Sequence, residues 1–342
     1  MGTNCSSLQL LTSMASRAII QQALVVYSYV GLWILLSASV ILYNKYVLTV
    51  FGFPYPVSLT MIHMAFCSAL AFVMVRVLKI VSGVKMNLDT YIRRIVPIGF
   101  LFAIVLWMGN SAYVYLSVAF IQMVKALMPC IVYVVGIAFK VETYTAKVMT
   151  NMVVIAVGVA IASYGELNFN TTGFLLLMGS LISESIRIVS IQLILTSVDI
   201  KLNPVTTLYY VSPACFVFLT IPFVFVELPH ILAAEIIPVN PVVLLSSAVL
   251  AFALNISVFL LIGKTSALTM NVAGVVKDWI LIFISSLLFD APIASLQLWG
   301  YLVAFIAVCH YNFLKFEEKE RASSGGVVNG DGAIKVQPYE GG

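Results

Sequence analysis

The stretch that decides the fold is Thr269–Leu288, TMNVAGVVKDWILIFISSLL. It is long and apolar enough to cross a bilayer as one helix, since about 20 residues rising 1.5 Å each span the hydrocarbon core. Lys277 and Asp278 nevertheless lie side by side near its middle. A charge at that depth costs about 2.5–3.5 kcal/mol on insertion scales, so such residues are rare and usually functional. The pair therefore marks a candidate site inside the membrane.

The composition of the whole chain agrees with this one stretch. Of its 342 residues, 62% are hydrophobic and 9% are charged, against roughly 25% charged in an ordinary globular domain. Apolar runs of membrane-spanning length recur nearly end to end. The sequence therefore predicts an all-α polytopic membrane protein.

Short links carrying prolines, glycines or charges separate ten expected transmembrane helices. Their approximate ranges are 27–49, 56–78, 95–116, 118–139, 147–165, 173–195, 205–227, 241–262, 266–288 and 294–315. We expect a transporter domain over 27–316, made of repeats 27–165 and 173–316. Residues 1–26 form a cytosolic tail, and residues 317–342, charged and then rich in glycine and serine, form a disordered cytosolic tail.

The distribution of positive charge fixes the expected orientation. With both termini in the cytosol, fourteen of the 18 lysines and arginines fall in cytosolic segments, and only Lys45 lies at the opposite face, as the positive-inside rule requires. The three remaining cations, Lys125, Arg187 and Lys277, lie inside predicted spans. These three form the candidate site.

Five spans in each half would force the two halves into opposite orientations, giving two inverted five-helix repeats. Lys125 then lies on span 4 and Lys277 on the equivalent span 9. At 1.5 Å per residue they lie about 10 Å and about 13–16 Å below the lumenal edge. Inverted halves with a charged site near the midplane are typical of alternating-access transporters.

Three buried cations favour an anionic ligand. Lysine binds phosphate as a point charge, and arginine binds it in bidentate fashion. Arg187 has an alternative, because Glu184 lies three residues earlier on the same helical face and can form an internal ion pair with it. Asp278 has three open roles: pairing with Lys125, carrying a proton, or contacting a sugar hydroxyl.

Catalytic chemistry is not indicated. His63, His230 and His310 are far apart, and no nucleophile–base pairing or metal-ligand spacing is present. We therefore expect no enzyme, no cofactor and no metal. His63 is interpreted as a helix-packing residue. Tyr209 is a candidate for stacking on a base or sugar, with ordinary packing as its alternative.

Several different short motifs are distributed along the chain. They are Tyr43-Asn44-Lys45, Phe53-Pro54-Tyr55-Pro56, Ile62-His63, Gln122-Met123-Val124-Lys125-Ala126, Ser163-Tyr164-Gly165-Glu166-Leu167, Arg187, Leu202-Asn203-Pro204, Tyr209-Tyr210-Val211-Ser212-Pro213 and the run from Asn255 to Lys277-Asp278. In these pieces the chain resembles the plant triose-phosphate and nucleotide-sugar translocators, within the drug/metabolite transporter fold. It looks closest to the Lys-Asp branch, usually labelled probable sugar phosphate/phosphate translocators.

The resemblance implies a ten-helix antiporter and roles for particular residues. The phosphate-binding lysine of span 4 carries over to Lys125, and the first residue of a Lys-Arg pair on span 9 carries over to Lys277. Asp278 stands where those relatives have the arginine, Gln122 where they have a histidine, and Leu254 where a substrate-holding tyrosine falls. The complete candidate substrate-binding set is Lys125, Lys277, Arg187, Asp278, Gln122, Tyr209 and Asn255.

We expect an antiporter that exchanges a nucleotide sugar or sugar phosphate for a nucleoside monophosphate or phosphate in the Golgi or another endomembrane. Residues 1–26 lack transit-peptide character, which disfavours a plastid. The expected partners are the bilayer, the phosphorylated solute and its counter-substrate, without nucleic acid; a homodimer is left open. Two alternatives remain: a proton-coupled transporter of a neutral or zwitterionic solute, and a non-transporting membrane protein that binds lipid phosphates.

Overall fold

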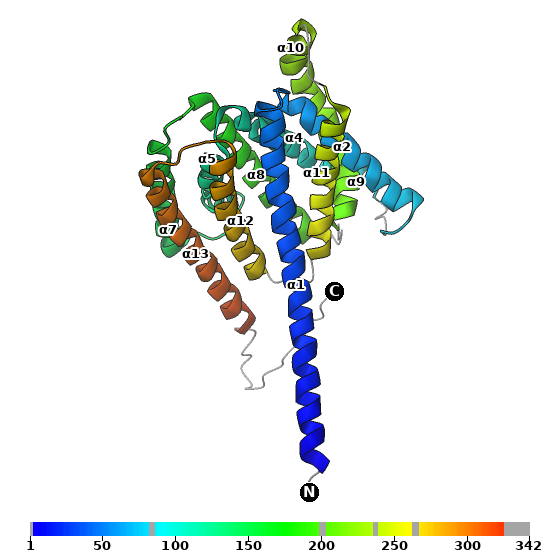
Figure 1. The fold of residues 1–342 in the computed structure, drawn as a ribbon, viewed down its shortest axis with the longest axis vertical. Helices are drawn as coiled ribbons and strands as arrows, with labels where there is room; N and C mark the ends of the chain where they lie inside the picture. The colour runs from blue at the N-terminus through cyan, green and yellow to red at the C-terminus, as the bar shows by residue number, and fades with distance from the viewer. Residues whose placement is uncertain (1–2, 82–85, 198–202, 235–238, 262–266, 325–342) are drawn as a thin grey trace.

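The computed structural model describes residues 3–81, 86–197, 203–234, 239–261 and 267–324. Every regular element in these ranges is a helix (Figure 1), which confirms the predicted all-α class. The helical bounds are α1 Thr3–Thr49, α2 Pro56–Phe72, η1 Val73–Val77, α3 Leu88–Thr90, η2 Tyr91–Ile95, α4 Val96–Tyr115, α5 Val118–Lys125, α6 Met128–Ala138, α7 Ala146–Tyr164, α8 Thr171–Ser197, α9 Pro204–Pro222, η3 Phe223–Glu227, α10 Leu228–Ala233, α11 Pro241–Leu261, α12 Ala267–Leu288 and α13 Ser295–Ser324. Elements marked η are single π-helical turns that continue their neighbours.

Nine helical stretches of the described chain are long and apolar enough to cross a bilayer. Predicted span 9, 266–288, is not among these nine stretches, but it coincides with α12, which is 22 residues long. Large apolar side chains such as Phe225, Phe283 and Trp299 are exposed on the outside of the bundle, where only lipid would cover them. The chain is an integral polytopic membrane protein.

One predicted span, 118–139, is divided into α5 and α6 by a break at Ala126 and Leu127. Pro129 explains the break, because proline has no N–H to donate to the carbonyl four residues earlier, that of Lys125. The amides of Ala126 and Leu127 turn instead to the carbonyls of Met123 and Val124, at 3.2 and 3.0 Å. Such broken helices at membrane depth occur where they line a cavity.

The packing of the helices runs mainly between the predicted halves. If the spans are numbered in chain order, α1 packs on α11 (spans 1 and 8), α2 on α9 (2 and 7), and α4 on α8 (3 and 6). Further, α5 packs on α12 (4 and 9) and α7 on α13 (5 and 10). If the two halves are exchanged, so that spans 1–5 become 6–10 and spans 6–10 become 1–5, the same five pairs result. Residues 27–165 and 173–316 therefore share one core rather than forming separate ones.

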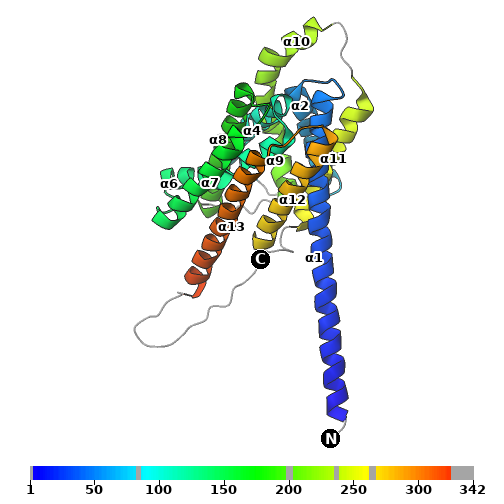
Figure 2. The ribbon, with the colours of Figure 1, turned by 60° about the vertical axis from the view of Figure 1, so that its left-hand side comes forward.

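Two helices extend beyond the ends expected from the sequence. α1 begins at Thr3 and has 47 residues, so at 1.5 Å per residue it is about 70 Å long, over twice the thickness of the hydrocarbon core. Its N-terminal half projects from the bundle (Figures 1 and 2), over residues expected to form a tail. α13 continues to Ser324, and the rest of the C-terminal tail expected to be disordered, 325–342, lies outside the described residues.

Candidate functional site

A cavity of about 240 Å³ lies between α5, α6, α12 and α13. Two of the helices around it come from each predicted half. Its polar or titratable lining residues are Gln122, Lys125, Asp278, Tyr301 and Asn312. Three residues of the predicted substrate-binding set, from spans 4 and 9, thus meet at one cavity.

Lys125 is the last residue of α5, directly before the break. Its Nζ lies 3.5 Å from the hydroxyl of Tyr113 and 5.8 Å from the centroid of that ring. None of the five ion pairs found among the described residues includes Lys125. Its ammonium therefore faces the cavity without a carboxylate in contact, although Asp278 belongs to the same lining.

Tyr113 was not predicted as a site residue, yet it links the cavity to one end of the bundle. Its hydroxyl lies 3.5 Å from both Lys125 Nζ and Gln122 Nε2. Its backbone carbonyl accepts a 2.6 Å hydrogen bond from Lys45 Nζ, which also donates to the Leu116 carbonyl at 3.1 Å. These carbonyls belong to the end of α4, where a helix leaves acceptors unpaired and favours a nearby cation. Lys45 thus caps α4.

Lys277 and Asp278 point in different directions from α12. Lys277 Nζ lies 3.3 Å from Asp278 Oδ1 and 5.6 Å from the centroid of the Trp33 ring on α1. Asp278 lines the cavity with Lys125, and Lys277 is not among that lining. Adjacent residues on a helix point about 100° apart, which accounts for the separation. The carboxylate, rather than the second lysine, faces Lys125 across the cavity.

Arg187 forms the internal ion pair that its spacing allows. Its Nε and Nη2 donate to Glu184 Oε2 and Oε1 at 2.7 and 2.5 Å, in bidentate geometry. The guanidinium also stacks 4.9 Å from the centroid of the Phe102 ring on α4. Arg187 is not part of the lining of the Lys125 cavity. The structure thus gives this arginine a bracing contact between α8 and α4.

Tyr209 and Asn255 also lie apart from the cavity lining. Tyr209 stacks on Phe72 and accepts a 3.0 Å hydrogen bond from Arg76 Nε, in a second pocket. Asn255 donates through Nδ2 to the carbonyl of Ala251, one turn earlier on its own helix, at 2.8 Å. The sequence places these residues in plausible spans but does not fix the direction of their side chains.

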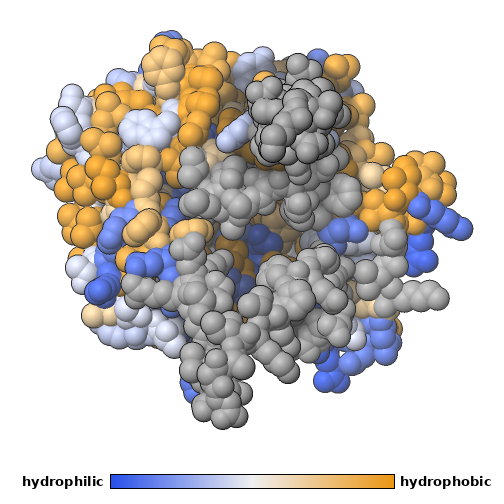
Figure 3. Space-filling view, turned by 90° about the horizontal axis from the view of Figure 1, so that it is seen from below, coloured by the Kyte–Doolittle hydropathy of each residue, from blue (hydrophilic) through white to orange (hydrophobic). Residues whose placement is uncertain are grey.

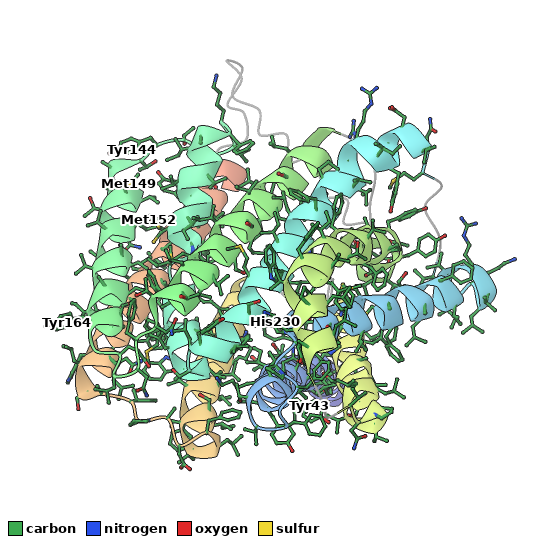
Figure 4. The ribbon with its side chains drawn as sticks, turned by 90° about the horizontal axis from the view of Figure 1, so that it is seen from above. Tyr43, Tyr144, Met149, Met152, Tyr164 and His230 are labelled. Carbon is green, nitrogen blue, oxygen red and sulfur yellow. The ribbon has the colours of Figure 1, made fainter. Side chains whose placement is uncertain are left out.

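Hydrogen bonds between helices close the end of the bundle at which α1 ends and α2 begins. The residues that form them are called the upper seal: Tyr43, Asn44, Lys45, His63 and Ser247. Tyr43 on α1 points toward α11 (Figure 4), where its hydroxyl lies 2.8 Å from Ser246 Oγ. Ser247 Oγ lies 2.8 Å from His63 Nε2 and donates to Asn44 Oδ1 at 3.2 Å. The predicted packing role of His63 agrees with these buried contacts. The upper seal joins α1, α2, α4 and α11.

Glu227 forms a further set of hydrogen bonds at the same end of the bundle. Its carboxylate is 4% exposed and accepts from the backbone N–H groups of Val57 and Ser58 at 2.6 and 2.7 Å, and from Ser58 Oγ at 2.6 Å. A carboxylate at a helix N-terminus satisfies orphan donors and opposes the helix dipole. The opposite face of the bundle is hollowed at its centre, with hydrophilic side chains at the bottom of the hollow (Figure 3).

A hydrogen bond to a loop carboxylate links α7 to α13, the last span of each predicted half. Glu166 follows α7, and its Oε2 accepts a 2.5 Å hydrogen bond from Gln297 Nε2 near the start of α13. Burial raises the pKa of the Glu166 carboxyl from its ordinary value of 4.5, against the opposing effect of the Gln297 hydrogen bond. Neither residue belongs to the lining of the Lys125 cavity, and the contact joins α13 to the end of α7.

The fold and the site together define a class. An all-α polytopic membrane protein has a cavity bounded by a broken helix, and its lining holds a carboxylate and a lysine that belongs to no ion pair of the described chain. No group of three or more metal-ligating side chains is found among the residues that the structure describes. This is an integral membrane protein with an internal polar site.

The chain belongs to the triose-phosphate transporter family, whose characteristic sequence matches residues 24–312. It is 52% identical over 304 residues, 88% of this chain and 87% of the relative, to a probable sugar phosphate/phosphate translocator of Arabidopsis thaliana. A second Arabidopsis protein of that description is 42% identical over 89% of this chain and 91% of the relative. UDP-galactose transporter 1 of Arabidopsis is 29% identical over 83% of this chain and 85% of the relative. The resemblance drawn from the motifs is confirmed.

Proposed function

We propose that the protein is a secondary-active antiporter that exchanges a phosphorylated sugar metabolite for a nucleoside monophosphate or phosphate by alternating access. The observation that carries the proposal is Lys125, a cation at a helix break that faces an internal cavity and has no carboxylate in contact among the described residues. The family of the chain and the similarity to probable sugar phosphate/phosphate translocators support a phosphorylated sugar as the solute.

Within the cavity we assign Lys125 to the phosphate and Asp278 to the hydroxyl groups of the sugar. An ammonium ion is a suitable point-charge ligand for phosphate, and a carboxylate accepts from hydroxyls. Lys277, at 3.3 Å from Asp278, balances the charge of that carboxylate. Gln122 Nε2 and the Tyr113 hydroxyl complete the set of polar groups around Lys125.

The size of the cavity favours the smaller of the two substrate classes. At about 240 Å³ it lies just below the ~300–1,000 Å³ typical of small-molecule sites. A sugar phosphate needs less room than a nucleotide sugar, so we propose sugar phosphates as the principal solutes. A nucleotide sugar would need further opening of the site.

The alternating movement is proposed to use two inverted halves, 27–165 and 173–316. The five pairs of packed helices stay the same when the two halves are exchanged, which supports a symmetric relation between the halves. In the conformation described here the upper seal is closed and the opposite face is hollowed (Figure 3). Transport then requires the bonds of Lys45 and Ser247 to break as the other end closes.

The proposed setting is an endomembrane such as the Golgi, with both termini in the cytosol. The distribution of lysine and arginine along the chain supports the orientation, and similarity to a nucleotide-sugar transporter supports the compartment. The oligomeric state stays open.

Exchange into liposomes tests the proposal. Purified protein is reconstituted into vesicles loaded with phosphate, a nucleoside monophosphate or no solute, and uptake of labelled hexose phosphate, triose phosphate and nucleotide sugar is measured. We expect uptake of a sugar phosphate only into loaded vesicles. Uptake of none of these phosphorylated solutes would end the proposal.

A proton-coupled transporter remains a second candidate because Asp278 lines the cavity. The same vesicles distinguish it. Collapse of an imposed pH gradient by an ionophore abolishes proton-coupled uptake, whereas strict exchange driven by the internal solute continues.

A further inference from the structure

A second pocket, of about 380 Å³, lies between α2, α9 and the turn η2 that precedes α4. We call it the α2–α9 groove and define it by Ser68, Phe72, Leu88, Tyr91, Tyr209 and Tyr210. It shares no lining residue with the Lys125 cavity. Its mouth faces outward, because Phe72 and Leu88 are 51% and 69% exposed. α2 slopes outward from the centre of the bundle (Figure 1).

A cation contacts the lining of the α2–α9 groove. Arg76 lies one helical turn beyond Phe72, is exposed, and donates from Nε to the Tyr209 hydroxyl at 3.0 Å. Its guanidinium lies 5.8 Å from the centroid of that ring. Within 74–81 and 86–95, the segments that flank the groove in sequence, the cations are Arg76, Lys79, Arg93 and Arg94, and the one carboxylate, Asp89, is bonded to Arg93 at 2.7 Å. These segments therefore carry an excess of positive charge.

The groove lies where two membrane spans reach the same surface. One span ends at Val77 and the next begins at Leu88, and their basic residues belong to the segments in which lysine and arginine gather. This is the depth of lipid phosphate groups, with acyl chains directly below. Tyrosines such as Tyr91 and Tyr209 are typical of that boundary.

We propose that the α2–α9 groove binds one anionic phospholipid, with an acyl chain along Phe72 and Leu88 and its phosphate on Arg76. A guanidinium has five N–H donors, and the bond to Tyr209 uses one of them and holds the group at the mouth of the groove. Arginine held in this way binds phosphate with several parallel bonds. Basic pockets between membrane helices bind lipid head groups by the same chemistry.

A soluble phosphorylated solute fits the groove less well than a lipid. The groove is lined mostly by apolar and aromatic side chains, against which sugar hydroxyls would lose their hydrogen bonds with water, at a cost in free energy. An acyl chain has no such groups to desolvate. The proposal is independent of the antiport proposal, because no residue of the Lys125 cavity takes part.

Lipid affinity of the full-length purified protein tests the proposal. Native mass spectrometry in detergent measures binding of phosphatidylglycerol and phosphatidylcholine of matched chain length. We expect the wild type to prefer phosphatidylglycerol. Arg76→Gln should weaken its binding about fivefold, since one basic contact with an anionic lipid contributes about 1 kcal/mol. Ser68→Phe fills the groove without changing any charge and should remove the preference.

Two control variants test whether the preference arises at the α2–α9 groove. Lys147→Gln removes an exposed basic residue at the start of α7 and should leave the preference unchanged. Lys125→Ala should retain the preference even where exchange is lost. Equal binding of the two lipids by the wild type, wild-type binding by both Arg76→Gln and Ser68→Phe, or loss of the preference in Lys125→Ala would overturn the proposal. Stabilisation by inorganic phosphate alone that depends on Arg76 would also overturn it, in favour of a soluble anion.

Discussion

Lys125 and Lys277 lie on predicted spans 4 and 9, which occupy the same place in the two predicted halves, yet their surroundings differ. Lys125 has a phenol and an amide nearby and belongs to the lining of the cavity. Lys277 has a carboxylate at 3.3 Å and the Trp33 ring beside it. A buried charge that is already paired has little capacity left for a ligand, whereas an unpaired one gains most when an anion arrives. The comparison supports the proposal that Lys125 binds the phosphate and that Lys277 balances the charge of Asp278.

The largest expected effect is that of Lys125→Ala. Removing the phosphate-binding cation should lower exchange of a sugar phosphate by about 10- to 150-fold, the factor corresponding to a hydrogen bond with a charged partner. Initial rates in loaded vesicles measure it, at matched amounts of inserted protein. Lys125→Arg, which keeps the charge, serves as the control and should retain part of the activity. Exchange at the wild-type rate by Lys125→Ala would break the comparison.

Lys277→Ala should also lower exchange strongly, but for a different reason. It leaves Asp278 as a partly buried carboxylate, with a 28% exposed side chain, without its partner. Leaving a partly desolvated polar group unpaired costs about 1–3 kcal/mol. The double variant Lys277→Ala/Asp278→Asn removes both charges and should recover expression, thermal stability and part of the exchange. Failure of the double variant to recover any exchange would mean that Lys277 binds the solute directly. Asp278→Asn added to Lys125→Ala should give no recovery.

A smaller effect is expected from Tyr113→Phe. The phenol oxygen lies 3.5 Å from both Lys125 Nζ and Gln122 Nε2. These are long hydrogen bonds, and their loss is worth about 1 kcal/mol. The KM for the sugar phosphate should rise about fivefold while the protein remains folded. Tyr115→Phe, on the same helix with a half-exposed side chain, is the matched control and should behave as the wild type. An unchanged KM in Tyr113→Phe would show that the hydroxyl does not orient Lys125.

The smallest effect is expected at Glu166, which is remote from both lysines. Because the pKa of its carboxyl is raised in the folded state, its contribution to stability is full below the ordinary value and is lost as pH rises through the folded value. The unfolding temperature of the wild type should therefore fall relative to Glu166→Gln from pH 4.5 upward. Parallel pH profiles for the two proteins would contradict this sign. Exchange at neutral pH should be unaffected by the substitution.

The sequence predicts the all-α, polytopic class because most of the predicted spans are apolar over a full bilayer thickness. It does not predict which way a given side chain points, since a helix that is apolar on all sides has no periodicity to orient it. For that reason the sequence did not indicate which neighbours the side chains of Lys277, Asp278 and Tyr209 would contact. Tyr113 escaped notice because an aromatic residue in a span is ordinarily a packing residue. Proline at 129 was a visible signal for the break in 118–139.

The break beside Lys125 divides one span between two packing groups. α5 packs mainly on α12, whereas α6 packs mainly on α8. If these groups move relative to one another, the backbone change is absorbed at Ala126 and Leu127, because Pro129 cannot bond to the carbonyl of Lys125. The lysine that we propose to bind the phosphate therefore lies directly at this break. A change in the backbone torsion angles there would turn its ammonium group, which would couple occupancy of the cavity to the arrangement of the helices.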